Sequence, residues 1–519
     1  MHFERQRALA RQRLSLERGR IDKQAPFTVA LAYPSPYRVA MSSLGFLRIY
    51  RALQDEPGMA CERVFLPDDA GGGFGMEAPL SYESLQPLTS YPLVALSVAY
   101  ELELAGVVQL LEASGIPSYR EQRDERHPLV LAGGPLTFSN PLPLAAYADA
   151  VVMGEADALA VEAAGVVRDA ASRADALAAL AKLPHVFVPE SHGDELPSIA
   201  QCDDALLPAW SPIVTPDTEL SNMFLIETER GCSRGCTYCV MRRTTNGGMR
   251  LVEAERILEL VPRDARRVGL VGAAVSDHPH IADIVRALAA RGAEVGLSSL
   301  RPDRLNDDFV SALAGAGYRT LTTAMDGASD RVREILDRRA RTRHLENAAE
   351  LARKHRMARL KLYLMLGVPG EEDEDIDECA RFVSELSRII PVALAIAPFC
   401  AKRNTPLDGQ PFAGIKVVSQ RVERLRRGLR GRADVRATSA RWAWIEYVLA
   451  QGGVREGRAV RDAVALGGRF ADYRRVYEAL PERTARRQLF IVRSSPSDAR
   501  RHLRWLERAP GVSETDARL

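Results

Sequence analysis

Three of the chain's seven cysteines lie within eight residues, in the order Cys-x3-Cys-x2-Cys, at Cys232, Cys236 and Cys239. A loop with thiolates at this spacing can wrap one face of a 4Fe-4S cube and leave the fourth iron without a protein ligand. Gly231 and Gly235 allow the backbone to approach the sulfides. The alternative is a structural zinc site completed by a distant His or Cys. Zinc usually takes its ligands as two separated pairs, so an isolated triplet favours the cluster.

The run from Cys232 to Cys239, with Tyr238 directly before the third cysteine, resembles the signature of the radical SAM superfamily. The resemblance implies that S-adenosylmethionine (SAM) binds the open iron through its amino and carboxylate groups and is cleaved reductively to a 5′-deoxyadenosyl radical. It also implies an external electron donor of the flavodoxin or ferredoxin type. We therefore expect Cys232, Cys236 and Cys239 to be the metal ligands and catalytic centre, with Tyr238 beside the cofactors.

Length and charge narrow the class of protein. At 519 residues the chain should contain about three domains. Its formal net charge is only +2, so overall charge gives no reason to expect nucleic-acid binding. The most apolar run, residues 92–111, is broken by Glu101 and Glu103, which argues against a membrane span. An odd number of cysteines, with three clustered, favours a reducing interior and predicts a cytoplasmic protein.

The first 26 residues are rich in arginine but also carry acidic residues, and they lack the apolar stretch of a signal peptide. We predict a surface helix here that ends near Gly19. A basic anchor for RNA or lipid is one interpretation. The pattern favours a solvated helix face.

Residues 27–170 alternate between apolar strands and helices, which predicts a doubly wound parallel sheet covered on both faces. In such sheets ligands bind at the carboxyl ends of the strands. The loops that follow the strands are therefore the informative ones. The predicted strands are residues 27–33, 62–66, 93–98, 128–132 and 148–153.

Most of this domain resembles the cobalamin-binding domain that precedes the barrel in many radical SAM enzymes. Ser97, Gly133 and Gly134 carry the resemblance at strand ends and are the expected cobalamin contacts, because paired glycines admit a bulky tail. The histidine that binds cobalt in the best-known cobalamin domains is absent between Tyr33 and Gly45. Tyr37 or a water molecule would then face the cobalt. The alternative is a vestigial sheet that only docks against the barrel.

Residues 171–220 read as a linker, and residues 221–405 contain a second strand and helix series. Six units fit the partial (β/α)6 barrel of radical SAM enzymes, with active groups at the carboxyl ends of strands. Residues 406–519 are predicted to be a helical C-terminal region whose basic helices have mainly solvated faces, an RNA or acidic-partner surface being the lesser alternative. The predicted barrel strands are residues 224–227, 267–271, 294–298, 320–324, 359–366 and 392–398.

Strand ends in the barrel supply the expected SAM contacts. The resemblance places the backbone of Gly272 at the SAM amino group. Arg301 is expected to pair with the SAM carboxylate, although a surface arginine is the alternative. Ser298 or Ser299 adds a hydroxyl. Asp277 is predicted to cap the helix that follows Pro279 rather than to act as an acid or base.

Two later strand ends complete this set. Asp326 stands where close relatives carry a glutamate near SAM or substrate, so its carboxylate reaches less far. Gly367 follows the fifth strand, in a segment whose backbone packs on adenine in the family. Residues 402–404 are polar and either face substrate or form a solvated loop.

These observations predict a radical SAM enzyme that carries out cobalamin-assisted C-methylation or rearrangement of an unknown small-molecule or peptide substrate. Radical chemistry without a corrinoid is the alternative within enzymes, and a metal-containing nucleic-acid-binding or assembly protein is the alternative of another class. The other cysteines are scattered singly, which argues against a second cluster and against methylthiotransferases. They are Cys61, Cys202, Cys379 and Cys400.

Overall fold

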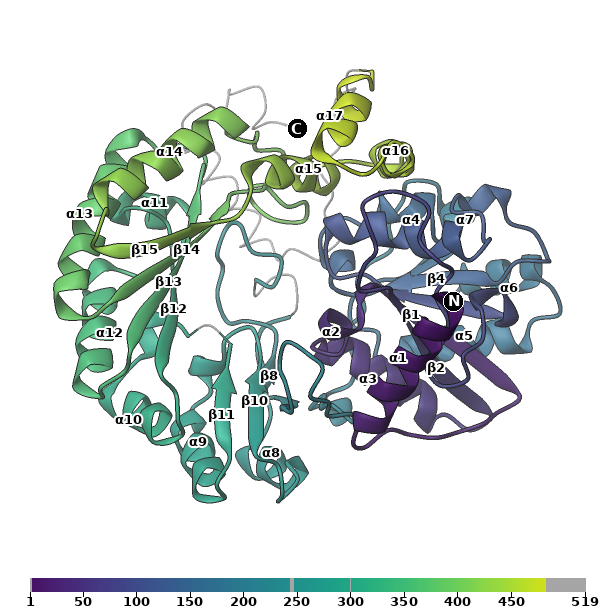
Figure 1. The fold of residues 1–519 in the computed structure, drawn as a ribbon, viewed down its shortest axis with the longest axis horizontal. Helices are drawn as coiled ribbons and strands as arrows, with labels where there is room; N and C mark the ends of the chain where they lie inside the picture. The colour runs from purple at the N-terminus through teal and green to yellow at the C-terminus, as the bar shows by residue number, and fades with distance from the viewer. Residues whose placement is uncertain (1, 243–246, 299, 482–519) are drawn as a thin grey trace. The chain divides into compact units, whose positions relative to one another are not determined.

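The computed structural model describes residues 2–242, 247–298 and 300–481, and the chain divides into two compact units (Figure 1). Of the described residues, the N-terminal unit comprises residues 2–224 together with 448–481, and the barrel unit comprises those between 225 and 447. The C-terminal helices α16 (Val454–Ala465) and α17 (Phe470–Glu478) therefore belong with the N-terminal sheet. The part of the predicted helical region beyond residue 481 lies outside the described residues.

The N-terminal unit is built on a six-stranded sheet in the order β2-β1-β3-β4-β5-β6. The strands β1 to β5 pair in parallel, as predicted, and β6 pairs antiparallel with β5. The strands are β1 (Phe27–Pro36), β2 (Met59–Leu66), β3 (Leu93–Ser97), β4 (Leu129–Gly133), β5 (Ala150–Val152) and β6 (Val186–Phe187). The helices before the barrel are α1 (His2–Leu16), α2 (Tyr37–Ala40), α3 (Leu44–Asp55), α4 (Leu104–Ala113), α5 (Leu159–Asp169), α6 (Arg173–Leu180) and α7 (Pro189–His192).

The core of this unit forms because β1 is apolar on both faces. Val29 and Leu31 on one face of β1, and Ala30 and Ala32 on the other, are almost completely buried. Helix α3 begins after Ser43, whose hydroxyl accepts the N–H of Phe46 at 3.3 Å, and this cap satisfies a free backbone donor. Phe46 and Leu47 then pack into the same core as β1. The capped helix α3 is thus packed firmly against strand β1 of the sheet.

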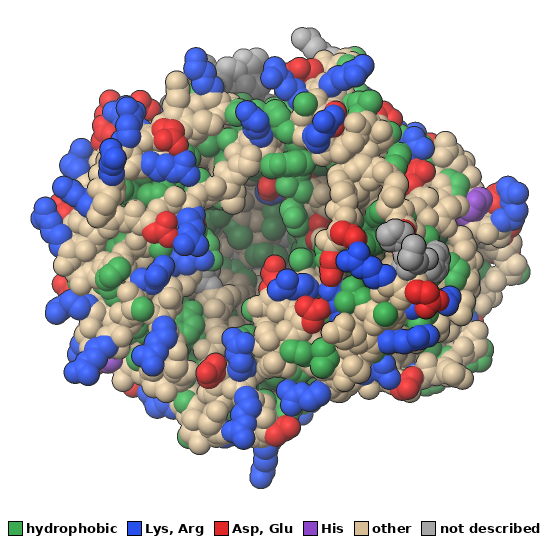
Figure 2. Space-filling model, viewed as in Figure 1, with side chains coloured by type: hydrophobic (Ala, Val, Ile, Leu, Met, Phe, Trp, Pro, Cys, Tyr) green, Lys and Arg blue, Asp and Glu red, His purple; other side chains and the backbone are tan. Residues whose placement is uncertain are grey.

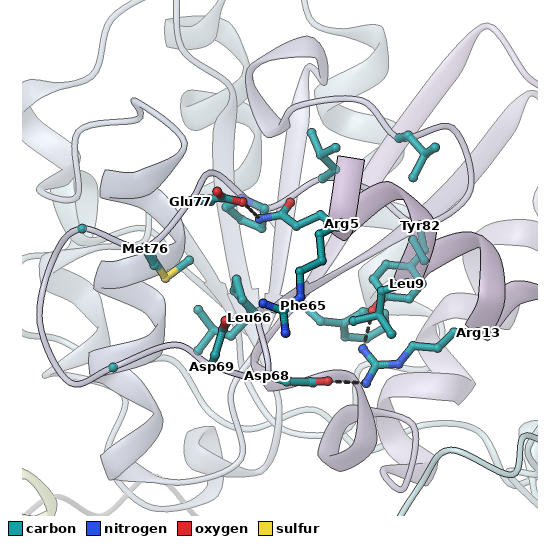
Figure 3. A pocket seen from close by; sticks show the side chains of 18 of the residues that line it. Arg5, Leu9, Arg13, Phe65, Leu66, Asp68, Asp69, Met76, Glu77 and Tyr82 are labelled. Atoms are coloured by element: carbon teal, nitrogen blue, oxygen red, sulfur yellow. Dashed lines mark hydrogen bonds and ion pairs between the residues drawn. The ribbon is translucent and has the colours of Figure 1, made fainter. Parts of the chain in front are cut away.

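The N-terminal helix α1 is not only a solvated helix, so that prediction is wrong for part of its length. Arg13 is 4% exposed and donates hydrogen bonds to Asp217 at 2.6 Å and to Tyr82 at 2.9 Å. Just after the helix, the buried carboxylate of Glu17 pairs with Arg63 at 2.8 Å. A cavity of about 610 Å³ lies between α1 and residues 65–85, with Arg13 at its wall (Figure 3).

The barrel unit is a curved sheet with helices on its outer side (Figure 1). Its strands form the sheets β11-β10-β7 and β12-β13-β14-β15, which are joined by a parallel bridge between Leu300 and Thr323. The strands are β7 (Phe224–Glu227), β10 (Arg267–Val271), β11 (Glu294–Leu297), β12 (Thr320–Asp326), β13 (Arg359–Leu366), β14 (Val392–Pro398) and β15 (Ala433–Ala437). The helices are α8 (Ala254–Leu260), α9 (Ile281–Ala290), α10 (Asp307–Gly315), α11 (Asp330–Ile335), α12 (Thr342–Lys354), α13 (Asp373–Ile389), α14 (Ile415–Gly428) and α15 (Ala440–Ala450).

Two features of this unit differ from the sequence prediction. β15 pairs in parallel with β14, so the region expected to be helical from residue 406 also adds a strand to the barrel sheet, after α14. A short antiparallel pair, β8 (Glu229–Arg230) and β9 (Arg250–Leu251), brackets the cysteine segment. This pair anchors both sides of the loop that carries the three cysteines.

None of the described helices combines the length and the apolar character needed to cross a lipid bilayer. On the face drawn in Figure 2, Lys and Arg side chains are spread over the surface with acidic side chains among them. That distribution agrees with the small net charge of +2.

Candidate active site

The three clustered cysteines lie in the loop that follows β8, and all three are free thiols. Cys236 is buried, and Cys232 and Cys239 are half-buried. Burial raises the pKa of each thiol, for Cys239 to about 12, and the charges of Cys236 and Cys232 add to that rise. The charges of the cysteines in this loop therefore act on one another. Thiolate donors of this kind suit an iron-sulfur cluster.

A single-ion site has no support from the side-chain geometry. Among the residues that the structure describes, no three His, Cys, Asp or Glu side chains converge on a position for one metal ion. A tetrahedral zinc site would need such convergence. The choice of a 4Fe-4S cluster, whose ligands attach to separate irons, therefore rests on the spacing of the three cysteines in the sequence.

The turn after α11 forms one wall of the cysteine loop. The N–H of Thr237 donates to the carbonyl of Leu336 at 3.0 Å, and its hydroxyl donates to the carbonyl of Ile335 at 3.3 Å. Two residues further on, the positive charge of the Arg338 guanidinium lowers the pKa of the Cys236 thiol against the larger effect of burial. The loop is thus fixed from a segment about one hundred residues away in sequence.

Asp326, at the end of β12, connects this wall to the loop. Its carboxylate accepts the hydroxyl hydrogen of Tyr238 at 2.9 Å and pairs with Nε of Arg338 at 2.7 Å. The backbone of Asp326 has φ +62°, a left-handed conformation that Asp adopts more readily than most residues. The structure therefore brings Tyr238 and Asp326 together, as expected for one site. A direct contact of Asp326 with SAM or substrate stays a prediction.

Arg301 is buried rather than a surface arginine, so that alternative is wrong. It is 5% exposed, and its guanidinium donates to Asp277 at 2.6 Å and to Asp303 at 2.5 Å. Both carboxylates also bind the cysteine loop, because Ser233 donates to Asp277 at 3.1 Å and Arg234 donates to Asp303 at 2.9 Å. Through these carboxylates Arg301 is connected to the segment between the first and second cysteines. Its pairing with the SAM carboxylate stays a prediction.

Asp277 does not cap the following helix, so that prediction is also wrong. Helix α9 begins after His280, and no side chain caps it. The Asp277 side chain is instead 1% exposed and pairs with Arg301. A buried carboxylate beside two guanidinium groups is stabilised more by those charges than by a helix end.

Gly272, at the end of β10, is needed because a buried carboxylate occupies the space beside it. A Cβ at this position would lie 2.0 Å from Oε1 of Glu229. Glu229 is 1% exposed and accepts the N–H of Ala274 at 2.7 Å. Burial raises its pKa to about 7, and the nearby charges of Glu227 and Asp277 add to the rise. Glu229 therefore places a buried carboxylate beside the turn that follows β10.

Ser298 lies beside the same turn, and its hydroxyl donates to the carbonyl of Gly272 at 3.1 Å. Two residues predicted separately therefore meet in the structure. Ser299, the other serine considered, lies outside the described residues. Whether Gly272 and Ser298 contact SAM stays a prediction.

Gly367, at the end of β13, has φ +86°, which favours glycine. Its N–H donates to Oε2 of Glu371 at 2.6 Å, and the same oxygen accepts Arg421 at 2.8 Å. Burial raises the pKa of Glu371 to about 7. The glycine backbone is therefore held in place from α14, whereas packing of adenine on it stays a prediction.

Two sequence families match the chain on either side of the linker. The family described as "Radical SAM superfamily" matches residues 226–383, which include the cysteine loop and the strands that support it. The family described as "Radical SAM proteins, N-terminal" matches residues 45–189. The chain is a radical SAM protein.

One similar protein matches most of the length of this radical SAM protein. "Uncharacterized protein MJ0966" from Methanocaldococcus jannaschii is 24% identical over 397 residues, which make up 74% of this chain and 80% of the relative. "Ribosomal protein uS12 methylthiotransferase RimO" from Thermotoga maritima is 23% identical over 180 residues, and the match spans 31% of this chain and 41% of that protein.

A solved structure of the cobalamin-dependent S-adenosylmethionine radical enzyme OxsB, with aqua-cobalamin and S-adenosylmethionine bound, matches with a TM-score of 0.49 and 11% identity. The match covers 77% of this chain and 56% of that chain.

The N-terminal sheet of this radical SAM protein does not supply the proposed cobalt ligand. Tyr37 is fully buried, and its hydroxyl donates to Glu17 at 2.7 Å and lies 3.2 Å from the hydroxyl of Thr215. It also stacks on Tyr82 with the ring centres 5.2 Å apart. Tyr37 is therefore part of the core, and its assignment as a group facing cobalt is wrong.

The strand-end residues that are expected to contact a corrinoid differ in how much space a side chain would have beside them. Gly134 has φ +107°, and a Cβ there would lie 2.6 Å from the carbonyl oxygen of Val98, so the fold itself requires this glycine. A Cβ on Gly133 would lie 3.5 Å from the nearest atom, which is ordinary contact. Ser97 and Gly133 are half-buried at the strand ends. Contact of Ser97, Gly133 and Gly134 with a corrinoid stays a prediction.

The loop after β14 is not a solvated loop. Arg403 is 6% and Asn404 7% exposed, and Lys402 donates to Glu446 at 2.7 Å. Contact of this loop with substrate stays a prediction.

Sequence reasoning missed three residues that support the cysteine loop: Arg338, Glu229 and Asp303. In the sequence, Arg338 lies in a charged run that is typical of a solvated segment. A turn, helix α11 and a second turn separate it from its partner Asp326, so the pairing has no local signal. Asp303 lies two residues after Arg301, in the short 3-10 helix that begins directly after Arg301. This two-residue spacing is the signal in the sequence for a local ion pair.

Proposed function

We propose that this chain is an enzyme that cleaves SAM reductively and uses the resulting radical to abstract hydrogen from an unactivated carbon of its substrate. The observation that carries this proposal is the Cys-x3-Cys-x2-Cys motif, Cys232 to Cys239, in a loop fixed from two directions. Arg338 and Asp326 hold the loop on one side, and Arg301 with its carboxylates holds it on the other. A 4Fe-4S cluster bound by the three thiolates would bind SAM and supply the electron that splits it.

Each supporting residue has a defined task in this proposal. Cys232, Cys236 and Cys239 bind the cluster. Gly272 and Ser298, which meet at 3.1 Å, offer backbone and hydroxyl oxygens beside the buried carboxylate of Glu229. An anionic and oxygen-rich turn of this kind suits the SAM ammonium group.

Arg301 and Gly367 are the other two residues to which the proposal gives a role in SAM binding. Arg301 orients the loop and supplies positive charge for the SAM carboxylate, and Gly367 leaves room for the adenine ring. The electron comes from an external flavodoxin or ferredoxin. The substrate is a small molecule or a peptide whose identity these residues do not define.

Anaerobic reconstitution with iron and sulfide tests the cluster directly. We expect about four irons and four sulfides per chain. Cys236→Ala should lose most of the iron and the absorption of the cluster while the chain stays folded. Cys400→Ser is the matched control, because Cys400 lies outside the triplet and its thiol contacts the carbonyl of Ala443 at 3.1 Å. Equal iron in the wild type and Cys236→Ala, or tight zinc in place of iron, would contradict the proposal.

Cobalamin-assisted C-methylation is the second candidate. The half-buried Ser97 and Gly133 at the ends of parallel strands favour it, because ligands bind at such edges. The absence of a suitable cobalt ligand in the loop of Tyr37 weighs against it. Radical chemistry without a corrinoid is the simpler form of the proposal.

Corrinoid retention during purification with added hydroxocobalamin separates the two forms. Gly133→Leu is the informative variant, because the sheet has room for a Cβ at this position. Gly134 is unsuitable, since any side chain there would strain the fold. Cobalamin that stays bound to the wild type and is lost from Gly133→Leu would support the second candidate, and a wild type that retains none would remove it.

A further inference from the structure

We propose that the barrel unit binds the phosphate backbone of a nucleic acid at the edge of its sheet where four strands begin. The surface consists of the connections that lead from a helix into β12, β13, β14 and β15, with the helix ends and strand starts beside them, and we call it the arginine edge. It comprises residues 312–320, 351–359, 386–392 and 425–433. This inference goes beyond the proposed function, because it assigns a partner to residues that have no part in SAM cleavage.

The four strands of this surface start side by side. β12 pairs in parallel with β13, β13 with β14 and β14 with β15, so their first residues lie along one edge of the sheet (Figure 1). Neighbouring strands are about 4.8 Å apart, so the four strand starts span about 14 Å. The charges of the four connections therefore add up on one continuous surface.

The arginine edge is rich in positive charge, and its four stretches contain no Asp or Glu. Five exposed arginines lie in the connections themselves or at a strand start. None of the five makes an ion pair or a side-chain hydrogen bond with a described residue, so their guanidinium groups are available to a partner. They are Arg319, Arg356, Arg359, Arg430 and Arg432.

Helix stability explains only part of this pattern. Cations in the last turn of a helix are stabilised by the helix dipole, and Arg353, Arg388 and Arg427 lie in such turns of α12, α13 and α14. The dipole acts only within the last turn. It gives no reason for the five arginines that lie beyond the helix ends.

A hollow of about 300 Å³ at the start of β14 gives the edge a place for one anionic group. Arg359, the first residue of β13, and Arg432, directly before β15, both line it. Asp434 lines it as well, but its carboxylate accepts Nε of Arg436 at 2.9 Å. Guanidinium groups bind phosphate oxygens through paired hydrogen bonds, so two available guanidinium groups at one hollow suit a phosphate.

The arginine edge lacks the apolar centre of a protein-binding surface. None of the large apolar side chains that are exposed among the described residues belongs to it. Protein interfaces have an apolar or aromatic core that is depleted in charge, whereas binding to nucleic acid depends mainly on Lys and Arg that neutralise phosphates. The edge therefore favours a nucleic acid over an acidic protein. The small net charge of +2 belongs to the whole chain and does not oppose this local surface.

The nucleic acid bound here is a docking partner. Asp326, at the end of β12, contacts Tyr238 of the cysteine loop at 2.9 Å, so the radical chemistry belongs to the opposite edge of the sheet. β13 has eight residues, and a strand rises about 3.3 Å per residue, which separates the two edges by about 25 Å. The arginine edge therefore holds the enzyme on a nucleic acid without presenting the bound phosphates to the cysteine loop.

The test is fluorescence anisotropy of the full-length protein with a labelled single-stranded RNA of mixed sequence and with DNA of the same sequence, over a range of salt concentrations. We expect a Kd of roughly 10⁻⁶ to 10⁻⁴ M near physiological salt for at least one of them. Arg359→Gln combined with Arg432→Gln should weaken binding roughly 10- to 30-fold at about 0.1 M salt and reduce the salt slope by about 1.4, because two phosphate contacts are lost. An unchanged melting temperature shows that this double variant is folded.

Arg11→Gln combined with Arg343→Gln is the matched control. Both arginines are exposed, neither pairs with a described residue, and neither belongs to the arginine edge. This control should bind as tightly as the wild type, although it has lost the same charge. Equal weakening by the two double variants, or no salt-dependent binding of either nucleic acid by the wild type, would overturn the inference. Tighter binding of labelled polyglutamate than of RNA and DNA would also overturn it, in favour of an acidic protein. Cys236→Ala should bind as the wild type does, which separates this inference from the proposed function.

Discussion

Asp277 and Arg301 form a buried ion pair that connects the loops after two neighbouring barrel strands. Nη1 of Arg301 lies 2.6 Å from Oδ2 of Asp277, and the two side chains are 7% and 1% exposed. Ser233 in the cysteine loop donates to the same carboxylate oxygen at 3.1 Å. The pair therefore couples the shape of the cysteine loop to the ends of β10 and β11.

Removing the Asp277 charge should destabilise the protein and loosen the cysteine loop. Asp277→Asn leaves Arg301 buried with Asp303 as its remaining carboxylate, and breaking a buried pair of this kind costs about 3 kcal/mol. We expect a lower urea midpoint for the cluster-free protein and less iron retained after reconstitution.

An exposed pair provides the control for that experiment. Asp283 is 66% exposed and pairs with Arg286 at 2.6 Å. Asp283→Asn should change the free energy of unfolding by less than about 0.5 kcal/mol, as exposed ion pairs contribute little. Equal effects of the two substitutions would show that the Asp277 pair has no special role.

The buried carboxylate of Glu229 should make stability depend on pH. Burial raises its pKa from 4.5 to about 7. Between these values the folded protein keeps a proton that the unfolded chain has lost, so the stability present below pH 4.5 is lost as pH rises through 7. The slope is at most about 1.4 kcal/mol per pH unit.

Glu229→Gln removes this ionisation with little change in shape. From pH 5 to pH 8, the melting temperature of the wild type should fall relative to that of Glu229→Gln. Parallel melting curves would mean that Glu229 has an ordinary pKa in the folded protein.

The C-terminal helices should detach from the N-terminal sheet when a glycine contact is filled. A Cβ on Gly468 would lie 1.8 Å from the carbonyl oxygen of Gly72, and Gly468 has φ +67°. Gly468→Ala should therefore expose α16 and α17 to limited proteolysis. Gly71→Ala is the control, because nothing lies within 4 Å of a Cβ there. Equal cleavage of both variants would contradict this docking contact.

The sequence predicted the barrel strands closely. β7, β10, β13 and β14 begin and end where the apolar runs predicted, because strands buried under helices need continuous apolar residues. β15 was missed. Its five residues, Ala433–Ala437, include Asp434 and Arg436 on an exposed edge, so the apolar signal is weak.

The supporting contacts of the site were harder to predict. The three cysteines form a local motif, whereas Asp326 and Tyr238 are separated by 88 residues and meet only through the fold. Asp277 precedes Pro279 and so matches a helix cap in sequence, yet a distant arginine offers the stronger partner. Local patterns describe local hydrogen bonds, and long-range ion pairs depend on strand order.

The release of 5′-deoxyadenosine from SAM tests the central claim most directly. Reconstituted wild-type protein, reduced with dithionite in the absence of oxygen, should release 5′-deoxyadenosine, and Cys236→Ala under the same conditions should release none. A wild type that holds its cluster but leaves SAM intact, or a Cys236→Ala variant that cleaves SAM as fast as the wild type, would contradict the account.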